Sequence, residues 1–123
     1  MRIDPESHRK MIEALRRGGA RGTWLRVVEA VLDLAGGEVE FLRHAEKRWH
    51  SATFSGTRHT VALAFTGPRA IAAGEAFIAG LPDHEFAIAG QLVAEAKVVS
   101  VEHVALPEPR LELEAELLLL EEV

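Results

Sequence analysis

The side chains best suited to chemistry in this sequence are histidines and a carboxylate in its central part: His44, His50, His59, His84 and Glu85. Imidazole titrates near neutral pH, so a histidine beside a carboxylate can accept and return a proton. We expect any acid–base site to contain His59, His84 and Glu85, with the carboxylate holding one histidine in the required tautomer. In such a site Arg58 would hold an anionic group and Trp49 would contact the ligand.

The same histidines also have a simpler explanation, as edge or surface residues that make local hydrogen bonds. A metal site would need three ligands to converge, and the chain has no cysteine to supply a thiolate. His44 and His50 are six residues apart, which places them on one face of an unbent strand. The sequence predicts neither a metal site nor a bound cofactor.

Other reactive groups fit structural roles better. No base accompanies the hydroxyl groups in a known nucleophilic arrangement, and threonine is a common strand residue. The sequence contains no Walker A loop, GxGxxG, HExxH or nucleophile elbow. The hydroxyl side chains lie close together: Ser51, Thr53, Ser55, Thr57 and Thr60.

The charge of the chain argues against nucleic acid as the main partner, because the net charge is −5. The distribution is uneven. Residues 1–58 contain eleven basic and eight acidic side chains, whereas residues 59–123 contain three and eleven. This asymmetry fits an acidic partner or the acidic half of a second copy, although acidic strand faces also serve solubility.

Targeting signals are not recognisable in the sequence. The start, MRIDPESHRK, has no apolar segment of the kind found in secretory signals. The apolar run Leu117–Leu120 is far too short to cross a bilayer. Since there is also no cysteine for a disulfide, the sequence predicts a cytoplasmic protein without a membrane partner.

Two helices are expected in the first third of the chain. Asp4 and Pro5 suit the start of a helix with a narrow apolar stripe, and we expect it to lie on the surface within residues 1–19. The second helix is expected to be capped by Thr23, to carry a wide apolar face from Trp24 to Ala35, and to end at the paired glycines Gly36 and Gly37.

Near alternation between Glu38 and Phe65 then predicts a β-hairpin. We expect its turn at Ser55-Gly56-Thr57, where a glycine stands between two hydroxyl residues. The second choice for the turn is the polar triplet Glu46-Lys47-Arg48.

The second half repeats this order. A helix should open at Gly67-Pro68 and carry Phe77 in its apolar stripe, with Gly74 allowing close approach to a sheet. Strands should follow, one with a bulge near Ala94-Glu95-Ala96 and one that alternates leucine and glutamate from Leu111. Phe77 and Leu63 are expected in the core and His103 outside it.

The order helix, strand, strand therefore occurs twice. This order favours an α+β fold with a four-stranded antiparallel sheet and helices on one face. Moving the first strand of the ferredoxin-like order βαββαβ to the end gives αββαββ. We therefore expect one domain over residues 1–123: a ferredoxin-like two-layer sandwich in permuted order over 23–121, preceded by the extra helix of 1–19.

A resemblance supports this fold. RWHSATFSGTRHTVALAFTG followed by PDHEFAIAGQLVAEA resembles a pattern in a family of small bacterial proteins of undescribed activity. It covers about half of the chain and implies a ferredoxin-like core, but no activity, substrate or catalytic residue. The matching positions are Trp49, Ser51 to Gly56, Arg58, His59, His84 to Phe86 and Leu92 to Ala94.

Three classes of function follow. The favoured one is a non-catalytic, dimeric domain that binds a small molecule or a protein. The alternative is a small enzyme with histidine and glutamate acid–base chemistry and an arginine that holds an anion. The third is a subunit of a larger assembly. A homodimer is expected through the exposed sheet face, because Leu118 and Leu120 point away from the side of Leu117 and Leu119.

Overall fold

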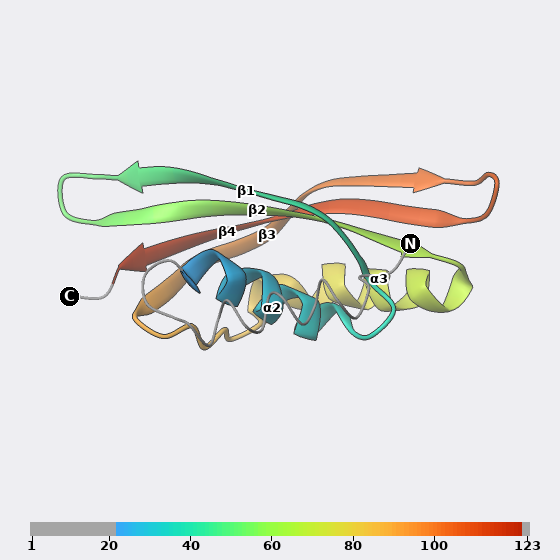
Figure 1. Ribbon diagram of the computed structural model, residues 1–123, viewed down its shortest axis with the longest axis horizontal. Helices are drawn as coiled ribbons and strands as arrows, with labels where there is room; N and C mark the ends of the chain where they lie inside the picture. The colour runs from blue at the N-terminus through green and yellow to red at the C-terminus, as the bar shows by residue number, and fades with distance from the viewer. Residues whose placement is uncertain (1–21, 122–123) are drawn as a thin grey trace.

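The computed structural model describes residues 22–121, so the helix expected within residues 1–19 lies outside the described residues. The described elements follow the order helix, strand, strand, occurring twice (Figure 1). They are α2 (Thr23–Ala35), β1 (Glu40–His50), β2 (Ser55–Thr66), α3 (Pro68–Gly80), the short 3₁₀ helix η2 (Leu81–Asp83), β3 (Gln91–Val104) and β4 (Arg110–Glu121).

The four strands form one antiparallel sheet in the order β1-β2-β4-β3, so β1 and β3 are its edges. Both helices lie on one side of this sheet, and the β1–β2 and β3–β4 hairpins extend in opposite directions (Figure 1). The face covered by the helices is called the inner face below, and the opposite one the outer face. The expected α+β architecture, a four-stranded antiparallel sheet with two helices, is confirmed.

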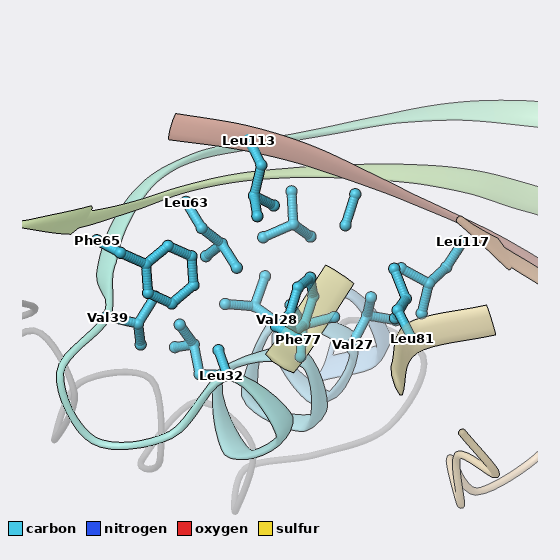
Figure 2. Packing of buried hydrophobic residues seen from close by; sticks show 14 of the residues in the cluster. Val27, Val28, Leu32, Val39, Leu63, Phe65, Phe77, Leu81, Leu113 and Leu117 are labelled. Atoms are coloured by element: carbon cyan, nitrogen blue, oxygen red, sulfur yellow. The ribbon is translucent and has the colours of Figure 1, made fainter. Parts of the chain in front are cut away.

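Strict alternation in β4 defines the two faces. Its leucines and alanine on the inner face are buried, and its glutamates on the outer face are half-buried. The inner residues pack against the apolar stripes of both helices, with Leu63, Phe65 and Phe77 among the contacts (Figure 2). The buried inner residues of β4 are Leu111, Leu113, Ala115, Leu117 and Leu119.

The core assignments agree with expectation. Leu63 and Phe77 are fully buried, and His103 is exposed. Helix α2 buries the expected stripe with the exception of Trp24, which is 37% exposed, while Leu25 takes a buried position. Trp24 therefore stands at the rim of the core.

Gly74 permits the close approach of α3 to the sheet, as predicted. A Cβ atom at this position would lie 2.8 Å from side-chain atoms of both Leu111 and Phe65. Glycine weakens a helix by about 1 kcal/mol relative to alanine. That cost is offset because the helix can then pack directly on the inner face of β2 and β4.

The predicted position of the first hairpin turn is wrong. Ser55, Gly56 and Thr57 lie within β2, and the alternative triplet at 46–48 lies within β1. The chain reverses over residues 51–54, where the N–H groups of Thr53 and Phe54 donate to the Ser51 hydroxyl. Gly56 lies within β2, and this strand position requires glycine because a Cβ there would lie 2.0 Å from the carbonyl oxygen of Leu119.

The register of β3 shifts twice. The shift between Val93 and Glu95 is the predicted bulge. A second one, between Val98 and Ser100, was not predicted. Each extra residue alters the alternation of faces along this edge strand, so Leu92 and Glu95 both pair with outer-face residues of β4.

Replacing Phe77 by alanine is expected to lower the free energy of unfolding by about 3–5 kcal/mol, because a fully buried aromatic side chain is lost and a cavity remains. Urea unfolding of the two proteins measures this difference. The exposed substitution Glu75→Ala, on the same helix, is the control and should change stability little. Equal midpoints for Phe77→Ala and the original protein would contradict the packing.

Replacing Gly56 by alanine is expected to cost about 1–3 kcal/mol, because the new methyl group overlaps the backbone of β4. Thermal unfolding checks this value against Gly37→Ala, where the added Cβ meets no atom within 4 Å. A neutral Gly56→Ala would mean that β2 and β4 are not paired at this point.

Candidate functional site

The structure distributes the predicted site residues over three places. Arg58 and His59 are consecutive in β2, and consecutive strand residues point to opposite faces. The Arg58 side chain lies on the outer face, where its guanidinium binds the carboxylate of Glu116. His59 is buried on the inner face beside Leu117. The two residues therefore do not share a site.

His84 and Glu85 lie in the segment between η2 and β3, and both are exposed. The ring of His84 contacts Phe86 edge to face, with ring centroids 4.5 Å apart. Both residues line a hollow of about 770 Å³ formed by residues 84–93. Within residues 22–121, no hydrogen bond, ion pair or ring contact joins His59 to His84 or Glu85.

Trp49 is the last of the predicted residues. It is half-buried near the end of β1, where it pairs with Gly56 on the outer face. Gly56 is itself buried, because the backbone of β4 occupies the position that a side chain would take. Trp49 therefore lies on the outer face, away from the buried His59.

A cluster that sequence reasoning did not assemble lies on the inner face of β1 and β2. The Nε2 atom of His44 lies 2.8 Å from the Nδ1 atom of His59. The indole of Trp24, in the first turn of α2, stacks on His44 with ring centroids 5.2 Å apart and an angle of 22° between the planes. The wrong hairpin turn hid this cluster, because the turn over residues 51–54 brings His44 next to His59.

Burial keeps this histidine pair uncharged. The pKa of His59 falls from 6.5 to about 4, first because the ring is desolvated and second because His44 would repel a second positive charge. Burial also lowers the pKa of His44, and the nearby carboxylate of Glu46 partly opposes that shift. At neutral pH one imidazole therefore donates its N–H to the unprotonated nitrogen of the other.

The chemistry open to this pair is limited. Two neutral imidazoles can pass one proton along their shared hydrogen bond, but an acid–base site would also need a carboxylate to fix the tautomer. No group of three or more metal-ligating side chains is found in the part of the chain that the structure describes. The cluster does adjoin a hollow of about 430 Å³, lined by Trp24, Phe41, His44, Ala45 and Glu46.

Comparisons with known proteins concern the fold. No protein-family model and no curated protein matches this chain. A chain from the solved structure "Virion of native gene transfer agent (GTA) particle" is similar to it, with a TM-score of 0.54, 16% sequence identity, and coverage of 89% of this chain and 91% of that chain. Among the described residues, no helix is long and apolar enough to cross a membrane.

The buried histidine predicts a loss of stability in mild acid. The unfolded chain binds a proton at His59 near pH 6.5, whereas the folded protein does so only near pH 4. The contribution of His59 to the free energy of unfolding is therefore complete above pH 6.5. It declines by up to about 3 kcal/mol as the pH falls to 4. Urea unfolding at pH 7.5, 5.5 and 4.5 measures it.

The variant His59→Leu isolates this effect from the titration of carboxylates. Its free energy of unfolding should depend less on pH between 6.5 and 4 than that of the original protein. His103→Gln, which changes an exposed histidine, should leave the pH dependence intact. If His59→Leu loses as much stability in acid as the original protein, His59 is not the titrating group.

Proposed function

We propose that this protein is a non-catalytic, protein-binding domain of the bacterial cytoplasm that forms a homodimer through the outer face of its sheet. The domain would serve as a subunit of a larger assembly. Its fold would be the permuted ferredoxin-like sandwich, because both the order αββαββ and the strand order β1-β2-β4-β3 follow when the first strand of that fold is moved to the end.

The observation that carries this proposal is an apolar row across the outer face. The strand registers place Trp49, Gly56, Leu120 and Leu92 side by side on β1, β2, β4 and β3. Leu92 is 55% exposed, and Leu118 adds a further leucine two residues along β4. In the described part of the chain, both helices lie on the opposite face (Figure 1).

The remainder of the outer face is polar but internally neutralised. Arg43 on β1 reaches across Ala62 of β2 to Glu114 on β4, at 2.5 Å. Arg110 likewise joins Glu40, at 3.0 Å, over the same strand. The small side chains of Ala62 and Ala64 on β2 leave room for these ion pairs, and the ion pairs in turn cover both alanines.

This neutrality favours a second copy as the partner. Residues 22–121 contain eight basic and fifteen acidic side chains, so most surfaces would repel their own copies. A two-fold contact brings the same patch together from both subunits. Charges that are already paired within one chain do not oppose each other across such a contact, and the apolar row supplies the area to bury.

The structural neighbour supports the wider role. That chain comes from a virion particle, a multi-subunit assembly, and it covers nearly the same length as this one. We extend only the general role, that of an assembly subunit, to this protein.

The enzyme alternative lacks a comparable observation. It requires Arg58, His59, His84 and Glu85 in one pocket, and the structure separates Arg58 from His59 by the thickness of the sheet. The large hollow at residues 84–93 holds His84 and Glu85 without the other two. A binding domain accounts for the same residues without this convergence.

Light scattering during gel filtration at micromolar concentration tests the proposal. The full-length chain should have a mass near twice 13.5 kDa. Leu92→Glu should shift it towards the monomer, because a carboxylate would enter the apolar row at an exposed position that the fold itself does not need.

Leu106→Glu is the matched control. Leu106 is 79% exposed at the far β3–β4 turn, so the same change should leave the mass unaffected. A monomeric original protein rejects the proposal, and so does a dimer that Leu92→Glu leaves intact. A larger mass that Leu92→Glu reduces would support assembly through this face.

A further inference from the structure

The hollow beside Trp24 is lined by residues that take no part in the proposed dimer contact. Apart from Trp24, its lining residues all belong to the edge strand β1. Phe41, His44 and Glu46 pair with the inner-face residues Leu63, Val61 and His59. The hollow therefore lies on the side of the sheet opposite the apolar row, and its volume of about 430 Å³ suits a small organic group.

Aromatic rings form two of its walls. One face of the Trp24 indole is covered by His44, while 37% of the residue stays exposed. Phe41 is half-buried in the same lining. An indole is the aromatic side chain that attracts cations most strongly.

Glu46 supplies a carboxylate at this place. Two arginines of β1 have carboxylate partners elsewhere, Arg43 with Glu114 on the outer face and Arg48 with Glu121 at the end of the strand. Within residues 22–121, Glu46 is exposed and forms no hydrogen bond or ion pair. Its carboxylate is therefore not paired with another side chain of the part of the chain that the structure describes.

The neighbouring histidines do not supply a competing positive charge at neutral pH. Their rings share a hydrogen bond of 2.8 Å, and burial lowers the pKa of both His44 and His59 below the ordinary value of 6.5. Among residues 22–121, the lining of the hollow combines an indole face, a phenyl ring and a carboxylate, and it includes no lysine or arginine. Such a combination is typical of sites that recognise ammonium or guanidinium groups.

We propose that this hollow binds an organic cation, with the charged group over the indole of Trp24 and against the carboxylate of Glu46. The cation is either a free small molecule or the arginine side chain of a protein, and both present the same chemistry to the site. This inference is independent of the dimer, because the two sites lie on opposite faces of the sheet.

Titration of the ¹⁵N-labelled full-length protein at pH 7.5 tests this proposal, with tetramethylammonium chloride and N-acetylarginine amide as separate probes. Binding should shift the indole N–H signal of Trp24 and the amide signals of residues 41–46, and sodium chloride at equal ionic strength should not. A response to both probes identifies a general organic-cation site. A response to the arginine derivative alone identifies a side-chain site.

Two variants locate the interaction. Glu46→Gln should weaken binding about two- to fivefold, since the carboxylate charge is removed while an exposed side chain of similar shape remains. Trp24→Leu should weaken it similarly, and its circular dichroism spectrum and melting temperature show whether it has folded. Glu102→Gln, on the exposed part of β3, is the control and should bind as the original does.

Two results would overturn the inference. One is the absence of probe-specific shifts around Trp24 at probe concentrations up to about 0.2 M, the range of dissociation constants that one cation–π contact alone would give. The other is equal binding by Glu46→Gln and the original protein. Neither result depends on whether the protein dimerises, which light scattering measures separately.

Discussion

Pairing of β2 with β4 along their whole length is the interaction on which the other features depend. These two central strands are in register from Gly56 with Leu120 to Thr66 with Arg110. The alternation of β4 turns leucines to the helices and acidic residues to the outer face. The register also requires Gly56, whose missing side chain lets the backbones approach. Core, outer-face ion pairs and apolar row are thus consequences of one strand pairing.

The sequence predicted the elements where the apolar periodicity was long and unbroken. Helix α2, the packing of Phe77, the role of Gly74 and the leucine–glutamate strand all follow from local patterns. The first hairpin was misplaced because Gly56 in a polar stretch has the composition of a turn, and its actual constraint comes from β4, more than sixty residues away. Only the three-dimensional pairing distinguishes a turn glycine from a strand glycine.

The candidate site shows the same limit. His44 and His59 were recognised as chemically suitable, but their contact depends on the position of the turn. Arg58 and His59 were grouped because they are adjacent in sequence, and in a strand adjacency places two side chains on opposite faces. Trp24 was expected to begin the apolar face of its helix, whereas its position in the first turn of α2 leaves its ring partly uncovered beside β1. Tertiary placement decided each of these outcomes.

Edge strand β1 contributes different side chains to the two faces of the sheet. Its outer-face side chains include Arg43, which joins Glu114, and Trp49, which extends the apolar row. Its inner-face side chains, His44 and Glu46, adjoin the hollow at Trp24. Because the two sets alternate along one strand, a substitution in either set leaves the other facing its own partner. The proposed association on one face and the proposed cation binding on the other therefore use different side chains of the same strand, and substitutions can test them separately.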